Sequence, residues 1–337
     1  MRLILSLDYE VFFGAKTGSV EKTLIEPTRA LSKVASRFAA PLVFFVDAGF
    51  LIRLRERKDD AGRSDYSKVR NQLDELVKQG HEIQLHIHPH WEDSVWDGTK
   101  WVIDTNRYRL HDHSPEAIRS IVKRYKNELD EVAGSDNVFA FRAGGWVLQP
   151  FADLRESLWD AGIWLDSTVY RGGLETSETH SYDFRGAPAM SRWWFDDDPL
   201  LPSSEGRFLE VPIASYRLPP SFYWQLAWFK KFGSARHRSF GDGSAIPLGR
   251  NDLAAKLFKS TYSVVSMDGF KASFISRAVR NYQVEKLDDF VVIGHPKALS
   301  EYSLDALEKS LSHMKQVDFV GYSFYRQERS ARTQVLE

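Results

Sequence analysis

The sequence predicts an α/β fold, a (β/α)7-8 barrel that forms a single domain over residues 1–337. Short runs rich in β-branched and aromatic residues alternate with stretches of helical periodicity, which is typical of a parallel sheet with crossover helices. About seven or eight such repeats occur, enough for closure into a barrel. Polar residues stand at the late ends of the strand-like runs, where parallel α/β folds carry their functional sites.

The expected elements follow one another regularly along most of the chain. The expected strands are 3–10, 42–48, 82–88, 138–144, 163–169, 209–213, 291–297 and 319–324, and the expected helices are 23–39, 66–79, 114–133, 150–161 and 303–315. Ser114, Pro115 and Glu116 give the third helix an N-cap and a first turn. An irregular, aromatic-rich segment at about 171–250 breaks the pattern. We expect it to be an insertion around one barrel strand that covers the site or a partner surface.

Composition excludes several classes of protein. The 45 basic and 46 acidic residues give a formal charge of -1, which argues against a nucleic-acid partner. The absence of cysteine excludes disulfides, thiolate zinc sites and cysteine nucleophiles. The apolar run in MRLILSLDYE meets two acids by position 10, too early for a signal peptide and too short to span a bilayer. We therefore expect a cytoplasmic protein without a transmembrane segment.

The stretch HEIQLHIHPHW (81–91) is the strongest candidate for a metal site. On a strand, His86 and His88 project to one face. Pro89 ends the strand and places His90 on the exit loop, where it can fold back toward His86. Neutral imidazole binds transition ions, so either His88 or His90 can complete a pair with His86. A polar strand with satisfied histidines is the alternative.

Asp8 and Glu10 can supply the remaining groups of a catalytic metal site. They lie two residues apart in LSLDYE, on one side of the first expected strand. A metal ion commonly takes a carboxylate as its third protein ligand and leaves one position open for water or substrate. One acid can therefore bind the metal while the other accepts a proton from its water. A pair of solvated acids at the start of a loop is the alternative.

GHEIQLHIHPH (80–90) resembles the second motif of the polysaccharide deacetylases with a NodB-like domain, carbohydrate esterase family 4. Five further stretches resemble motifs or strands of that family in the same chain order: SLDYE (6–10), PLVFFV (41–46), FRAGGW (141–146), LDST (165–168) and IGHP (293–296). The resemblance implies a distorted (β/α) barrel. It also implies removal of N- or O-acetyl groups from glycans with a divalent metal, often zinc.

At the matching positions the resemblance also implies roles for individual residues. Asp8 matches the catalytic base, Arg142 the residue that orients the base, and His295 the general acid. Asp166 matches the partner that tunes this acid. His86 and His90 match the two metal-binding histidines.

The sequence departs from the family at two motifs. Tyr9 follows Asp8 where the family has a second aspartate, so Glu10 replaces that ligand, Asp8 is the ligand itself, or metal binding is weakened. FRAGGW has glycines before Trp146 where the family has proline and an aromatic ring. Because glycine permits close backbone approach, the floor of the groove is expected to be reshaped.

Aromatic residues suggest substrate and partner surfaces. Trp91 and Trp146 follow the expected site residues and can stack on sugar faces, with core packing as the alternative. SFYWQLAWFKKFG (221–233) is expected to form a lid or a dimer surface, so a homo-oligomer is allowed. Binding to a membrane surface or to a lipid-linked saccharide is the weaker alternative.

The function predicted from these features is a metal-dependent hydrolase that removes an acetyl group from a saccharide or polysaccharide precursor. The expected cofactor is a divalent ion, with zinc preferred, and the expected partner is a saccharide substrate. A related hydrolase of non-peptide amides acting on a small molecule is the first alternative. A non-catalytic saccharide-binding protein with a degraded site is the second.

Overall fold

The computed structural model describes residues 1–177, 179–245 and 257–336. Its centre is a nine-stranded sheet in the order β10-β11-β7-β6-β3-β2-β1-β14, with β15 also paired to β1. Only the pair β10–β11 is antiparallel among the described pairs of this sheet. Its strands are β1 (Arg2–Tyr9), β2 (Leu42–Asp47), β3 (Glu82–Ile87), β6 (Ala140–Ala143), β7 (Leu165–Asp166), β10 (Trp193–Phe195), β11 (Phe208–Glu210), β14 (Asp289–Val292) and β15 (Asp318–Phe319).

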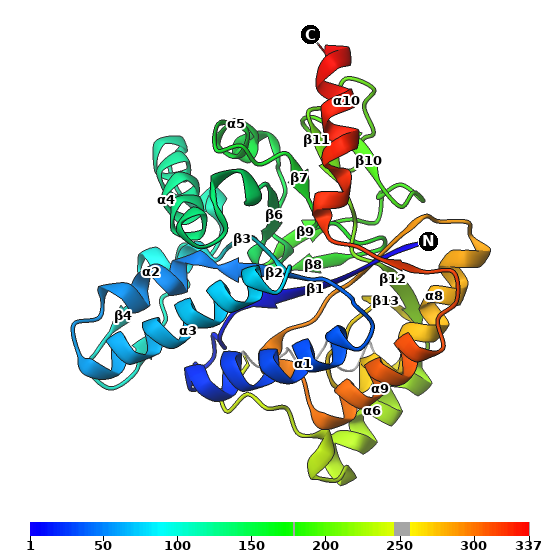
Figure 1. Cartoon of the computed structure of the whole chain (residues 1–337), viewed down its shortest axis with the longest axis horizontal. Coiled ribbons are helices and arrows are strands. Elements are labelled where there is room, and N and C mark those ends of the chain that lie inside the picture. Colours follow the sequence, from blue (N-terminus) through cyan, green and yellow to red (C-terminus); the bar gives the residue numbers. More distant parts are fainter. Residues whose placement is uncertain (178, 246–256, 337) are drawn as a thin grey trace.

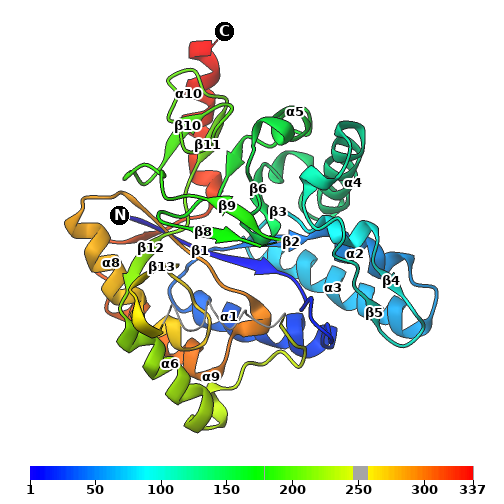
Figure 2. The same cartoon turned by 180° about the vertical axis from the view of Figure 1, so that it is seen from behind.

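Helices lie around the outside of this sheet (Figures 1 and 2). They are α1 (Glu26–Ser36), α2 (Ala48–Glu56), α3 (Asp60–Lys78), α4 (Pro115–Ala133), α5 (Ala152–Asp160), α6 (Pro220–Phe232), α8 (Ile275–Val284), α9 (Glu301–Ser312) and α10 (Arg326–Leu336). The predicted cap of α4 is present, since the Ser114 side chain accepts a hydrogen bond from the Ala117 amide. None of the described helices is long and apolar enough to cross a bilayer.

The sheet curls until its two ends meet. The chain that leaves β11 pairs in parallel with β14 through an isolated bridge between Ile213 and Val291. A second bridge joins Ser266 to Ile293, just after β14. The single bridge at the junction explains why the barrel is distorted. The predicted fold class, an α/β fold with a curled parallel sheet, is confirmed.

The inside of the curled sheet is layered from apolar to charged. Ile4, Phe45 and Leu165 belong to an inner cluster of buried side chains, which Tyr322 and Tyr325 also join. Because alternate residues of a strand share a face, Ser6 and Asp8 follow Ile4 on the inner side of β1. The apolar layer thus supports a polar layer, which ends in charged residues at the carboxyl ends of the strands.

The predicted insertion at 171–250 is more regular than its sequence suggests. Besides β10 and β11 of the main sheet, it holds a hairpin of β8 (Leu174–Thr176) and β9 (Ser181–Asp183), helix α6, and β12 (Ser215–Leu218). Strand β12 pairs with β13 (Thr261–Val264) outside the main sheet. Residues 178 and 246–250 of the predicted insertion lie outside the described residues. Strands of three or four residues are too short to show a clear alternation in sequence, which explains the irregular appearance.

Candidate functional site

The candidate site lies where β1, β3 and β14 end. In parallel strands the carboxyl ends meet at one edge, so side chains distant in sequence converge there. Asp8, Glu10, His86, His88 and His295 come together in this way.

Glu10, His86 and His88 form a group whose ligand atoms all lie within 4.8 Å of one another. The Nε2 atom of His88 is 2.6 Å from Glu10 Oε2, and Nε2 of His86 is 3.3 Å from the same oxygen. All three side chains are buried. Two imidazoles and one carboxylate are a donor set that suits a catalytic transition-metal site.

The ring of His86 is oriented by the backbone. Its Nδ1 lies 2.8 Å from the carbonyl oxygen of Arg142, which can only accept a hydrogen bond. Nδ1 therefore carries the proton and Nε2 faces Glu10, the orientation of a metal-bound histidine. Burial lowers the pKa of His86, but the nearby carboxylates Asp8 and Glu10 outweigh it and raise the pKa to about 8. The acids thus favour a positive charge here, which a metal ion can provide in place of the proton.

His88 also fits the role of a ligand. Burial lowers its pKa to about 4, against the opposing effect of Glu10, so its ring is neutral at pH 7. Its closest polar contact among the described residues is the 2.6 Å approach of Nε2 to Glu10 Oε2. A Cβ atom at Gly144 would lie 2.6 Å from His88 Nδ1, so the glycine of FRAGGW is required for this packing.

His90 lies outside this group of ligand atoms. Pro89 begins a 3-10 helix, Pro89–Glu92, and His90 is its second residue. Its fully buried ring stacks on Tyr108 with 5.7 Å between centroids and lies 5.4 Å from the ring of His88. The resemblance implied His90 as the second histidine, whereas the geometry brings the alternative, His88, next to Glu10.

Asp8 is held by Arg142. The guanidinium Nη1 donates to Asp8 Oδ1 at 2.7 Å, and its other nitrogens donate to the Ser167 carbonyl and to the hydroxyl of Ser6. The second oxygen of Asp8 faces the site, at 4.0 Å from His86 Nε2 and 3.6 Å from His295 Nε2. Asp8 therefore has one oxygen held by Arg142 and one that faces His86 and His295.

His295 has a carboxylate partner that sequence reasoning missed. Its Nδ1 is 2.7 Å from Asp268 Oδ2, and its amide donates to Asp268 Oδ1 at 2.8 Å. Burial lowers the pKa of His295, but Asp268, helped by Asp8 and Glu10, outweighs it and raises the pKa. Asp268 ends the run SVVSMD (263–268). An acid at the end of an apolar run is the sequence pattern that could have identified it.

Asp166 does not reach His295 because it lies on the other face of the sheet. Its neighbour Leu165 packs in the inner cluster, so Asp166 points outward. There its carboxylate accepts hydrogen bonds from the amide and hydroxyl of Thr168, beside Glu210 of β11. The carboxylate in contact with His295 is therefore Asp268, whereas the predicted partner Asp166 lies on the other face of the sheet.

Lys297 is a second residue that the sequence did not suggest. Its Nζ donates to Glu10 Oε1 at 2.9 Å and to the Val11 carbonyl at 2.7 Å. Burial alone would raise the pKa of Glu10, but Lys297 and the two histidines lower it well below its usual value. Lys297 stands two residues after His295. This spacing could have indicated that both side chains point toward the site.

The two tryptophans proposed to bind substrate differ in position. Trp91 is 0% exposed, and its Nε1 donates to Asp47 at 2.6 Å, so it offers no ring face to a substrate. Burial raises the pKa of Asp47 to about 7. Trp146 is half-buried, with its ring 5.8 Å from that of Tyr170, and stays a candidate for substrate contact.

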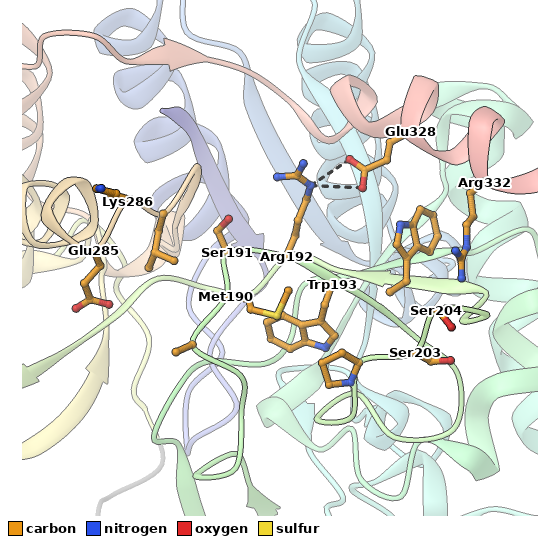
Figure 3. A pocket seen from close by; sticks show the side chains of 14 residues that line it. Met190, Ser191, Arg192, Trp193, Ser203, Ser204, Glu285, Lys286, Glu328 and Arg332 are labelled. Carbon is orange, nitrogen blue, oxygen red and sulfur yellow. Dashed lines mark hydrogen bonds and ion pairs between the residues drawn. The ribbon is translucent and has the colours of Figure 1, made fainter.

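A surface pocket elsewhere contains none of these residues (Figure 3). Residues around β10 and from α10 line it, and Arg192 joins Glu328 across it. Arg192 also pairs with Asp289, the first residue of β14, whereas His295 follows the last. The pocket therefore lies toward the opposite end of the barrel from the candidate site.

Comparison with known proteins shows similarity of fold only. No protein-family model matches the sequence, and no curated protein matches it. A structure described as a polysaccharide deacetylase from Mycobacterium smegmatis has a TM-score of 0.50 and 15% identity, covering 98% of this chain and 91% of that chain. PuuE allantoinase has a TM-score of 0.49 and 13% identity over 98% and 90% of the two chains. A family 4 carbohydrate esterase from Streptomyces lividans has a TM-score of 0.36 and 9% identity over 93% and 87%. The chain thus has the fold of the polysaccharide deacetylases.

Proposed function

We propose that this chain is a metal-dependent hydrolase that removes an acetyl group from nitrogen or oxygen of a saccharide or saccharide precursor. The observation that carries the proposal is the convergence of Glu10, His86 and His88 beside Asp8 and His295. The fold shared with the polysaccharide deacetylase from Mycobacterium smegmatis supports the same class of reaction.

Glu10, His86 and His88 would hold the metal. Their carboxylate and imidazole donors suit zinc, and their ligand atoms lie within 4.8 Å of one another. A bound divalent ion supplies Lewis acidity and lowers the pKa of water from 15.7 to about 7. The residues around it then position the substrate and transfer protons.

Asp8 serves as the general base in this proposal. Its Oδ1 is occupied by Arg142, so the free Oδ2 is the oxygen that accepts a proton from the attacking water. Arg142 is itself fixed by Ser6 and Ser167, which keeps Asp8 from rotating. Such a positioned base contributes about 10²–10⁴-fold in rate.

His295 serves as the general acid. Its Nδ1 is engaged by Asp268, so Nε2 is the nitrogen that faces the reacting groups. The raised pKa keeps a proton on the imidazole to higher pH, where it can be donated to the leaving nitrogen or oxygen. An amine or alkoxide leaves productively only when it is protonated, so the reaction needs both the base and the acid.

The narrow access favours a small substrate group. The side chains of Asp8 and Glu10 are each 8% exposed and that of His295 is 19% exposed. The ring of Phe13 lies 4.4 Å from His88 and 4.6 Å from His90, covering part of the site. These contacts support a monosaccharide or chain end over the interior of a long polymer. They equally support the second candidate, hydrolysis of a small non-peptide amide.

Acetate release tests the proposal. Purified protein loaded with zinc is incubated with N-acetylated and O-acetylated mono- and oligosaccharides, and acetate is measured before and after chelation. Acetate release that stops with the chelator and in Asp8→Asn is the expected result. The control is Asp288→Asn, because the Asp288 side chain is 73% exposed and lies outside the site.

Other outcomes separate the alternatives. Release of an amine from small amides, with no acetate from any sugar, would favour the second candidate. Saccharide binding by a protein that takes up no metal and releases nothing would favour a non-catalytic role.

A further inference from the structure

Helix α6 exposes a row of large aromatic side chains. Trp224, Trp228 and Phe232 are 55%, 64% and 59% exposed and are spaced four residues apart, so they share one side of the helix. Phe258, 75% exposed, lies nearby because Trp224 Nε1 donates to the carbonyl of Leu257 at 3.1 Å. We call Trp224, Trp228, Phe232 and Phe258 the aromatic surface. Contiguous exposed apolar groups of this kind usually mark an interaction site.

The other side of α6 anchors the helix to the barrel. Phe222 is 1% exposed, and its ring lies 4.9 Å from that of Phe274. Phe229 packs on Phe270 at 4.7 Å between ring centroids. In both cartoon views α6 lies at the outer edge of the molecule, beside α9 (Figures 1 and 2). The aromatic surface therefore is not needed to attach the helix and faces away from the barrel.

The chain around α6 is basic. Residues 211–241 contain no aspartate or glutamate but five basic residues, although the whole chain has a formal charge of -1. Lys231 and Arg238 are exposed, and Lys231 Nζ lies 5.2 Å from the ring centre of Phe232. Arg236 pairs with Asp305 of α9. Positive charge thus accompanies the exposed rings at one place on a nearly neutral protein.

We propose that α6 docks the protein on the surface of a lipid bilayer that carries anionic lipids. Tryptophan and phenylalanine insert at the boundary between headgroups and acyl chains, while lysine and arginine remain among the anionic headgroups. The combination of four exposed rings with an acid-free basic segment matches that boundary in both polarity and charge.

A second copy of the chain fits the same surface less well. In a two-fold symmetric contact the patch meets itself, so Lys231 and Arg238 of each copy would approach each other without an acid from this segment. A lid fits less well too, because the anchored side of α6 faces the barrel and the aromatic surface faces outward. The structure thus favours binding to a membrane surface, which was the weaker alternative in the sequence analysis.

Docking would bring one wall of the candidate site near the bilayer. Phe270, which packs on α6, lies two residues after Asp268. The chain after α6 returns to the rim of the site, where the amide of Gly241 donates to the carbonyl of Lys297 at 3.2 Å. The docking proposal does not depend on the proposed function, because it rests on residues outside the site.

Flotation with lipid vesicles tests the proposal. The full chain is mixed with vesicles of phosphatidylcholine alone or with about 30% phosphatidylglycerol, an anionic lipid of the kind that attracts basic segments. Wild-type protein is expected to float with the anionic vesicles, and Trp228→Ser/Phe232→Ser is expected to lower the partition coefficient at least about tenfold. Lys231→Glu/Arg238→Glu is expected to remove the preference for anionic lipid. Leu201→Ser/Val284→Ser, which replaces residues 65% and 82% exposed elsewhere, is the matched control.

Three results would overturn docking. Wild-type protein would fail to float, or the aromatic double variant would float as well as wild type. Alternatively, sedimentation would show a wild-type dimer that the aromatic variant dissociates, with no vesicle binding. Circular dichroism checks that each variant is folded. If Trp228→Ser/Phe232→Ser is not folded, the charge-reversal variant and Trp224→Ser provide the same comparison.

Discussion

Two pairs of buried acids lie on opposite faces of the same sheet, and they have different surroundings. Asp8 and Glu10 on the inner face each contact a cation, Arg142 for the former and Lys297 for the latter. Asp166 and its neighbour Glu210 on the outer face are instead met by backbone amides and a hydroxyl.

The difference separates a site for chemistry from a structural pair. Buried carboxylates that must stay charged need cations or a metal, and the inner face provides the cations Arg142 and Lys297. On the outer face, burial raises the pKa of Asp166, and burial together with Asp166 raises that of Glu210 well above its usual value. Arg142 lowers both pKa values but does not outweigh these effects, and two adjacent carboxyls of this kind are most stable when they share a proton.

The largest expected effect is the difference in activity between an asparagine variant of the inner pair and one of the outer pair. Asp8→Asn is expected to lower kcat/KM for acetate release about 10²–10⁴-fold, because a positioned base is lost. Asp166→Asn, on the other face, is expected to stay within about tenfold of wild type. Steady-state kinetics measures both values. Equal losses in the two variants would contradict the assignment of separate roles.

The pair His295 and Asp268 should show the next largest effect. His295→Ala is expected to lower kcat/KM about 10²–10³-fold, and exposed His313→Ala serves as its control. Asp268→Asn removes the group that chiefly raises the pKa of His295. Since the protonated imidazole is the active form, the alkaline limb of the pH–rate profile should move to lower pH. An unchanged alkaline limb would mean that another group is the acid.

The ends of the strands could be predicted from sequence. Which residue of the short strand β7 faces inward could not. Each main strand carries apolar residues and a polar end, so the edge that holds Asp8, His86, Arg142 and His295 was foreseeable. Strand β7 contains only Leu165 and Asp166, and two residues do not show which side faces inward. The packing of Leu165 in the inner cluster decides this.

The other features of the site could not be predicted from sequence because they depend on local backbone geometry. Whether His88 or His90 approaches Glu10 depends on the 3-10 helix that starts at Pro89, which is not evident from residue types. Asp268 follows the four-residue strand β13, too short to be recognised. Helix α6 has apolar residues on both its anchored and its exposed sides, so it shows no amphipathic pattern.

Lys297→Met tests whether the cation beside Glu10 competes with a metal. An ammonium at 2.9 Å from Glu10 Oε1 repels a divalent ion on the same carboxylate. Removing it is expected to tighten zinc binding about tenfold or more, as measured by competition with a chelating dye. Exposed Lys309→Met should leave the affinity unchanged. Weaker binding in Lys297→Met would instead show that the lysine is needed to position Glu10.

Glu210→Gln tests the outer pair through stability. The pKa of Glu210 is raised in the folded state. Its contribution to the free energy of unfolding is therefore full below the unfolded-state pKa of 4.5 and is lost as the pH rises through the folded-state pKa. In that window the wild-type free energy of unfolding should fall by about 1.4 kcal/mol per pH unit relative to the glutamine variant. Urea unfolding from pH 4 to pH 8 measures the difference. Parallel curves for the two proteins would show that Glu210 is ionised in the fold.

Metal content measured after dialysis against zinc tests the central claim most directly. Elemental analysis is made on wild type, His88→Ala and His90→Ala, with circular dichroism to confirm folding. If Glu10, His86 and His88 hold the ion, wild type and His90→Ala contain one zinc per chain and His88→Ala contains none. A wild-type protein without zinc, or loss of zinc in His90→Ala with retention in His88→Ala, would contradict it.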